Sequence, residues 1–245
     1  MISVAPVIPQ QNRFALLLIG APKSGKTNLA FQFPRPKFID CDMNLESALR
    51  RQPSKQYQRL LVDFDEQGNE VALDMRWPRL LALVNKDWNS DTYDTLVIDS
   101  MTKIRNYLQD YLLSRTTATK DLVIGGEKMM TINHWGPYAV LMQRFVSGLR
   151  KIPKYVIVTA HLHSEKDETD GKWLFKPAIG GQSEDTLAGI FTDLWCCEAQ
   201  PASGGVKYTV RTVPSARIVL GNTLNLPESY TFSWDDFKKR MDVFK

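Results

Sequence analysis

The chain has 245 residues, of which 43% are hydrophobic, and it carries a formal charge of +4. This size favours a single α/β domain over residues 1–245, and the apolar runs are far shorter than the roughly 20 residues that cross a membrane. The N-terminal segment lacks a secretory signal pattern, so we expect a cytoplasmic protein with no membrane partner. Two of the three cysteines are adjacent, so we expect reduced thiols.

Strand and helix patterns alternate along the chain. Apolar periodicity predicts helices over 75–88, 102–114 and 135–149, and a first helix of about two turns from Lys26 to just before Pro34. Short apolar runs predict strands over 14–19, 37–40, 60–64, 94–99, 154–160, 192–197 and 206–213. We therefore expect an α/β fold with a mostly parallel central sheet flanked by helices and a β-rich C-terminal extension.

Two segments lack apolar periodicity and are predicted to be long loops. They cover residues 115–133, which include the pair Gly125-Gly126, and residues 164–185, which contain further glycines. Long loops within a compact domain commonly carry function.

A phosphate-binding motif lies between the first strand and the first helix. Residues 20–27, GAPKSGKT, match the pattern G-x-x-x-x-G-K-[ST] and follow the apolar run FALLLI. In this arrangement backbone N–H groups face the phosphates of a nucleotide, Lys26 neutralises the β and γ oxygens, and Thr27 binds Mg²⁺. The predicted nucleotide-binding residues are Gly20, Ala21, Pro22, Lys23, Ser24, Gly25, Lys26 and Thr27.

Polar side chains at three other strand ends fit the chemistry of hydrolysis. Asp99 ends the run DTLVID and is the second predicted ligand of the metal. Because Ser100 cannot act as a base, we expect the base that activates water near the end of the strand FID, where Asp42 is preferred to Asp40. His161 ends the strand YVIVTA and is predicted to sense the γ-phosphate.

Four segments together resemble the RecA family, and more closely the phage-encoded RecA-like ATPases of single-strand annealing and recombination. They are GAPKSGKT, FIDCDMNLE, LVIDS and VIVTAHLH. The resemblance implies ATP and Mg²⁺ as cofactors, Asp42 as the base where RecA has Glu, and His161 where RecA has Gln. It covers about residues 14–220, which leaves residues 1–13 and 221–245 as extensions too short to fold alone.

The resemblance also assigns the two long loops to DNA binding. The second loop would close with Gly180-Gly181-Gln182, similar to the Gly-Gly-Asn of the family. Its lysines and rings suit a phosphate backbone and stacked bases, although its acidic residues equally fit a solvated hairpin. The candidate contacts with single-stranded DNA are Lys120, Lys128, Lys166, Lys172, Trp173, Phe175 and Lys176.

RecA-type ATPases form rings or filaments in which basic residues of one subunit reach the nucleotide of the next. A homo-oligomer is thus implied, with Arg211 or Arg217 in that role, and a single-strand-binding protein is a candidate partner. The leading function is ATP-dependent recombination or annealing of DNA. The alternatives are an AAA-type remodeller or helicase loader, which is expected to have Asp-Glu in place of Asp99-Ser100, and a binding module that barely hydrolyses ATP.

Overall fold

The computed structural model describes residues 14–115, 122–168, 170–179 and 189–243. Its main sheet has nine strands in the order β11-β10-β9-β1-β7-β4-β2-β3, with β8 paired to β7. Neighbours from β3 to β9 pair in parallel, whereas β8, β10 and β11 pair antiparallel. The strands are β1 (Phe14–Gly20), β2 (Pro36–Asp40), β3 (Gln58–Leu61), β4 (Thr95–Asp99), β7 (Tyr155–Lys166), β8 (Trp173–Pro177), β9 (Asp193–Ala202), β10 (Gly205–Arg211) and β11 (Ser229–Tyr230).

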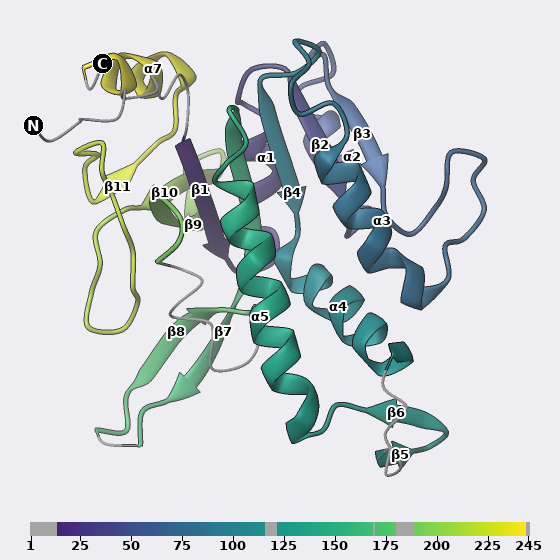
Figure 1. The fold of residues 1–245 in the computed structure, drawn as a ribbon. Helices are drawn as coiled ribbons and strands as arrows, with labels where there is room; N and C mark the ends of the chain where they lie inside the picture. The colour runs from purple at the N-terminus through teal and green to yellow at the C-terminus, as the bar shows by residue number, and fades with distance from the viewer. Residues whose placement is uncertain (1–13, 116–121, 169, 180–188, 244–245) are drawn as a thin grey trace, which may run out of the picture.

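Helices cover both faces of this sheet (Figure 1). Three of them, α3, α4 and α5, pack on one face, while α1, α2 and α7 pack on the other. The helices are α1 (Lys26–Ala30), α2 (Glu46–Leu49), α3 (Leu73–Asn85), α4 (Met101–Arg115), α5 (Ile132–Leu149) and α7 (Trp234–Asp242). None of those described is both long and apolar enough to cross a membrane. The predicted α/β fold with a mostly parallel sheet is confirmed.

The central strand β1 shows how the sequence builds the core. All seven of its residues are buried, because a central parallel strand is covered on both faces. Between Phe14 and Ile19 its odd-numbered side chains face α3, α4 and α5, and its even-numbered ones face α1 and α7. Full burial of a leucine-sized side chain contributes about 1.5–3 kcal/mol. This strand therefore anchors the phosphate-binding motif that follows it.

The core extends past residue 220, where the sequence suggested its end. Phe237 of α7 is fully buried, and its ring lies 5.1 Å from that of Phe14 and 5.2 Å from that of Phe33, measured between centroids. Phe232 stacks on Phe33 at 5.1 Å. Aromatic pairs in this geometry add about 0.5–1.5 kcal/mol beyond the area they bury. Residues 221–243 thus help to close the core beside β1.

Both predicted loops contain β-hairpins, so that part of the prediction is wrong. The first is formed by β5 (Leu122–Ile124) and β6 (Glu127–Met129), joined by Gly125 and Gly126 with positive φ angles. The second arises because β7 continues to Lys166 and returns as β8. Gly180-Gly181-Gln182 lies outside the described residues. Figure 1 shows both hairpins projecting from the carboxyl end of the parallel strands.

Smaller differences concern lengths. The first helix, α1, has five residues instead of about two turns, because the chain turns before Pro34. Residues 216–220, part of the predicted β-rich extension, form no continuous strand, and Ile218 makes isolated bridges to Phe175 and Ser215. The C-terminal part is therefore less rich in β-structure than expected, since it also contains α7.

Candidate functional site

The phosphate-binding motif forms a tight loop between β1 and α1. Gly20 ends β1 with φ +155°, and a Cβ there would lie 2.5 Å from Ser24 Oγ and 2.7 Å from the carbonyl oxygen of Cys197. Gly25, at φ +95°, is the N-cap of α1, and a Cβ there would meet the ring of Tyr208 at 2.7 Å. Only glycine fits at these two positions. The motif therefore fixes a backbone path as well as a set of side chains.

The Lys26 ammonium lies inside this loop. Its Nζ donates to the carbonyl oxygens of Gly20 and Ala21, at 2.9 Å each, and the residue is only 6% exposed. Burial lowers the pKa of Lys26, while the carboxylates of Asp99 and Asp42 act in the opposite direction. The loop thus holds the ammonium next to the positions that the phosphate oxygens of a nucleotide would take.

Asp99, at the end of β4, is held by two threonine hydroxyls. Thr27 Oγ1 donates to Asp99 Oδ2 at 2.6 Å, and Thr159 Oγ1 donates to Oδ1. Burial raises the pKa of Asp99, whereas the two hydrogen bonds favour its ionised form. A buried carboxylate beside a threonine hydroxyl offers two hard oxygen ligands, as a Mg²⁺ site requires.

The two carboxylates near the end of β2 differ in their surroundings. Asp40 is almost fully buried, and Arg59 contacts its Oδ2 through Nη2 at 2.7 Å and Nε at 2.9 Å. Burial raises the pKa of Asp40, and Arg59 opposes that effect. Asp42 lies past the strand end and faces the cavity beside Lys26 and Thr27. Asp40 is therefore engaged in an ion pair, while Asp42 borders the space above the motif.

His161 lies on β7 directly opposite Gly20 in the sheet register. Its Nε2 is 4.0 Å from Asp42 Oδ2, and its backbone N–H donates to Thr102 Oγ1 at 3.0 Å. Its Nδ1 is buried and, within the described residues, has no hydrogen-bond partner. Burial and then the Lys26 charge lower the pKa of His161, and Asp42 opposes them. The imidazole is therefore biased towards its neutral form.

One cavity of about 770 Å³ brings these residues together. This volume lies within the range of small-molecule sites. Thr159 was missed by the sequence analysis, although it precedes His161 by two residues on the same face of β7. Arg51 and Tyr208, which gave no sequence signal, also line the cavity. The predicted residues that line it are Pro22, Lys23, Gly25, Lys26, Thr27, Asp42, Asp99 and His161.

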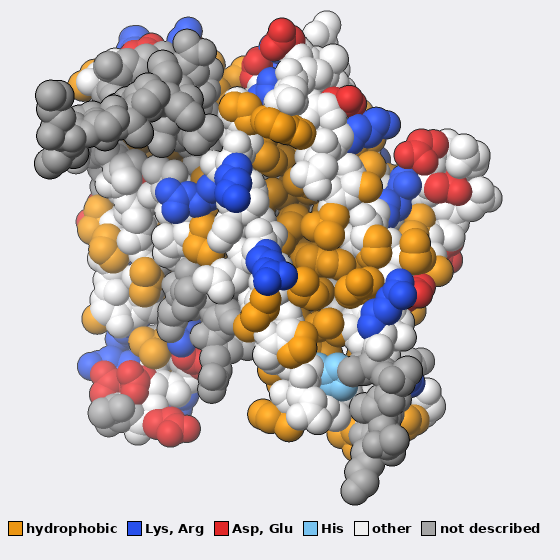
Figure 2. All heavy atoms as spheres, in the orientation of Figure 1, with side chains coloured by type: hydrophobic (Ala, Val, Ile, Leu, Met, Phe, Trp, Pro, Cys, Tyr) orange, Lys and Arg blue, Asp and Glu red, His pale blue; other side chains and the backbone are white. Residues whose placement is uncertain are grey.

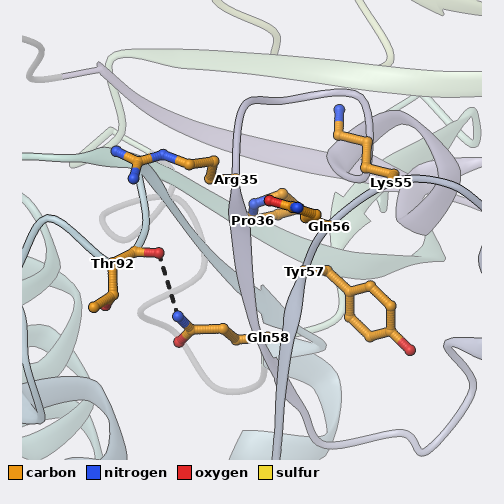
Figure 3. Close-up of a pocket in the computed structure, with 7 residues that line it drawn as sticks. All are labelled: Arg35, Pro36, Lys55, Gln56, Tyr57, Gln58 and Thr92. Atoms are coloured by element: carbon orange, nitrogen blue, oxygen red, sulfur yellow. Dashed lines mark hydrogen bonds between the residues drawn. The ribbon is translucent and has the colours of Figure 1, made fainter.

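A second pocket, of about 420 Å³, lies at the opposite end of the strands (Figure 3). It lies where β2 and β3 begin, and its lining includes Arg35, Lys55 and Tyr57. Gln58 Nε2 donates to the carbonyl oxygen of Thr92 across it, at 3.3 Å. None of the described residues that line this pocket carries a carboxylate. It is therefore separate from the residues that the motif brings together.

The two arginine candidates lie outside the cavity lining. Arg211 Nη2 pairs with Glu198 Oε1 at 2.7 Å on the neighbouring strand. Arg217 is exposed, and its carbonyl oxygen accepts a hydrogen bond from the backbone N–H of Phe175 at 2.8 Å. Arg217 therefore lies beside the β7–β8 hairpin, whereas Arg211 lies in β10, between β9 and β11 of the main sheet.

Most of the DNA candidates lie on the β7–β8 hairpin. Trp173 is 54% exposed and Phe175 is 39% exposed. Their cross-strand partners are Lys166 and Ser164, respectively, so both rings lie on the same face of the hairpin. Lysines elsewhere in the hairpin form ion pairs: Lys172 with Asp170 at 2.6 Å and Lys176 with Glu165 at 2.7 Å. Lys128 is exposed on β6, and Lys120 lies outside the described residues.

Comparison with known proteins gives one family match. A family model described as an AAA domain matches residues 12–224. A KaiC-like protein of the archaeon Pyrococcus horikoshii OT3 aligns at 14% identity over 90% of this chain and 84% of its own, with a TM-score of 0.46. The flagellar accessory protein FlaH of Methanocaldococcus jannaschii aligns at 12% over 80% and 76%, with a TM-score of 0.35. Both TM-scores lie below 0.5, so the fold rests on this chain's own strand order. No curated protein matches the chain.

Proposed function

Because the chain belongs to the AAA domain family of P-loop ATPases, we propose that it binds ATP with Mg²⁺ in the 770 Å³ cavity and hydrolyses it. The observation that carries this proposal is the convergence of five side chains at the edge of the sheet where β1, β2 and β4 end and β7 passes beside Gly20. They are Lys26, Thr27, Asp42, Asp99 and His161. Such a constellation positions a triphosphate and a water for phosphoryl transfer.

The residues present fit a magnesium ion. Thr27 and Asp99 supply hard oxygens 2.6 Å apart at the base of the cavity, and we assign them to hold it. When bound, the ion neutralises charge on the phosphate oxygens. Thr159 fixes one oxygen of Asp99, which leaves the other directed at Thr27.

Each remaining side chain has a role in the hydrolysis. Lys26 exchanges the carbonyl oxygens of Gly20 and Ala21 for oxygens of the β- and γ-phosphates. Asp42 orients the attacking water and accepts its proton. The ion pair between Asp40 and Arg59 supports Asp42 over Asp40 in this role. His161, beside Asp42, donates a hydrogen bond to the γ-phosphate.

We further propose that the protein acts on single-stranded DNA through the β7–β8 hairpin. The aromatic face of Trp173 and Phe175 offers stacking surfaces for bases, and Lys166 adds a positive charge beside them. Because Lys172 and Lys176 are paired with acidic side chains, stacking contributes more to this contact than charge does. Arg217 follows the same hairpin and adds to its charge.

The assembly proposed is a homo-oligomer, a ring or a filament. It is supported by exposed apolar side chains on the α3–α5 side of the molecule, which Figure 2 shows as orange areas. The exposed apolar side chains of α3, α5 and β5 include Leu73 and Met75, Val140, and Leu122 and Ile124. Patches of this kind mark protein interfaces. The proposed setting is phage-type recombination or annealing in the cytoplasm of a bacterial host, with a single-strand-binding protein as a further partner.

The alternative is an AAA-type remodeller or helicase loader that acts on protein partners. The description of the matched family favours it. Two features favour the DNA proposal instead. Ser100 stands where that class is expected to have Glu, and the sheet continues beyond β9 into β10 and β11 where a helical lid would be expected.

Steady-state hydrolysis, measured with and without single-stranded DNA over a range of salt, tests the proposal. We expect Mg²⁺-dependent ATPase activity that single-stranded DNA stimulates. Hydrolysis that is indifferent to DNA at every salt concentration would contradict the DNA role and favour the remodeller. Absence of hydrolysis in a single-turnover assay, with ATP still bound, would instead identify a binding module.

A further inference from the structure

One wall of the 770 Å³ cavity is made by residues without a role in the phosphate chemistry. This wall comes from α1, α2 with the turn after it, and β10. Tyr208 of β10 and Arg51, just after α2, lie on it, together with Asn28 and Ser47. Asp42 and Asp99, the carboxylates of the cavity, belong to the catalytic group around Lys26 and Thr27. The wall therefore offers a ring, a guanidinium, an amide and a hydroxyl.

Tyr208 has a fixed place relative to the phosphate-binding loop. Its ring packs against Gly25 so closely that a Cβ on that glycine would be 2.7 Å from the ring. Gly25 is the N-cap of α1 and directly precedes Lys26. A nucleotide whose phosphates follow residues 20–27 is thus brought next to this ring when its base leaves the loop.

Arg51 closes over the same ring. Its guanidinium carbon lies 4.7 Å from the ring centroid, and its Nη2 donates to the Tyr208 hydroxyl at 2.9 Å. Arg51 is exposed and Tyr208 is half-buried, so little free energy is needed to break the contact between them. The guanidinium covers the ring face on which a base would stack.

We infer that Tyr208 and Arg51 form a base clamp, which accepts purine nucleoside triphosphates and separates ATP from GTP poorly. The base stacks on Tyr208, and Arg51 moves from the ring to the edge of the base. A guanidinium only donates, so it suits N7 of either purine and O6 of guanine. Asn28 and Ser47 can accept from the amino group of adenine. A pyrimidine has a single ring and covers less of the tyrosine.

This inference rests on the proposed nucleotide site, and its test separates the two. Affinities of ATP, GTP, CTP and inorganic tripolyphosphate are measured by calorimetry in the presence of Mg²⁺. For the unchanged chain we expect ATP and GTP to agree within about threefold and CTP to bind about tenfold more weakly, given the energy of base stacking. Equal affinities for ATP and CTP would overturn the clamp. Failure to bind either ATP or tripolyphosphate would overturn the nucleotide site itself.

Substitutions locate the effect. Tyr208→Ala should weaken ATP and GTP by about ten- to a hundredfold, the range of aromatic stacking on a base, and leave tripolyphosphate affinity unchanged. Tyr208→Phe keeps the ring and should retain most of the affinity. Tyr57→Ala, an exposed tyrosine in the pocket of Figure 3, is the matched control and should change none of the affinities. If Tyr208→Ala weakened tripolyphosphate as much as ATP, the ring would only support the loop, and the clamp would be rejected.

Discussion

The nucleotide cavity and the β7–β8 hairpin share one strand but differ in how their residues are held. In the cavity, Lys26 and Asp99 are buried and fixed by short hydrogen bonds to the loop and to neighbouring strands. On the hairpin, Trp173 is largely exposed, and Lys172 and Lys176 pair with acidic neighbours. The cavity residues are thus held by the surrounding fold, whereas the hairpin presents an exposed surface. Substitutions should therefore affect the two regions independently.

The largest difference in effect between the cavity and the hairpin is expected from Lys26→Ala. The substitution removes the ammonium that lies within the loop, so hydrolysis should fall to the uncatalysed background and ATP binding should weaken severely. Binding of single-stranded DNA to the nucleotide-free chain should not change. Calorimetry measures the binding of ATP and of DNA, and a phosphate-release assay measures hydrolysis. A variant that still hydrolyses ATP would place the site elsewhere.

A comparison of Asp42→Asn with Asp40→Asn should distinguish the two carboxylates. Loss of a general base lowers kcat by about 10²- to 10⁴-fold, and we expect this for Asp42→Asn with ATP affinity retained. Asp40→Asn should keep kcat and lose about 1–3 kcal/mol of unfolding free energy, because Arg59 loses the buried one of its two charged partners and keeps only Glu46. Single-turnover rates and urea unfolding measure the two effects. The opposite pattern would make Asp40 the base.

On the hairpin, Trp173→Ala should weaken single-stranded DNA binding by about five- to a hundredfold, through loss of stacking. ATP affinity in the absence of DNA should stay the same. The matched control is Trp88→Ala, because Trp88 is also exposed, at 39%, but lies just after α3. Fluorescence anisotropy with a labelled oligonucleotide measures the effect. If both variants lost equal affinity, the hairpin would have no special role.

The smallest effect concerns pH. The pKa of His161 is lowered in the folded chain, so the folded state binds fewer protons there than the unfolded state. The stability that neutral His161 contributes is complete above the unfolded pKa of about 6.5 and is lost as pH falls through the lower folded value. Below pH 6.5 the Tm of the His161→Gln variant should therefore rise by about 1 °C relative to the Tm of the unchanged chain. A Tm difference that stays constant from pH 7.5 to 5 would contradict this prediction.

The sequence was most informative where a motif and a buried strand coincide. GAPKSGKT after FALLLI, and Asp99 after a buried run, gave positions that the structure brings together in one cavity. Their places follow from parallel strands whose carboxyl ends meet at one edge of the sheet. The catalytic roles of Asp42 and His161 remain predictions, and the substitutions above test them.

The sequence was least informative where tertiary contacts decide. The β5–β6 hairpin had a signal, Gly125-Gly126 between two short apolar runs, but the segment is too polar overall for periodicity to reveal it. The helix α7 had Ser233 as N-cap with two aspartates in its first turn, and only its packing against Phe14 shows why it matters. Tyr208 gave no signal, because its contact with Arg51 joins residues 157 positions apart.

The place of β1 in the sheet has a consequence for synthesis. Its neighbours are β7 and β9, and the hydrogen bond from Ala15 to Thr192 spans 177 positions of sequence. During synthesis, the apolar segment 14–20 leaves the ribosome long before its partner strands β7 and β9 and before Phe237. Contacts this distant slow folding and leave an unpaired strand available to other chains. Translation rate and chaperone supply should therefore govern how much of the protein reaches its native state.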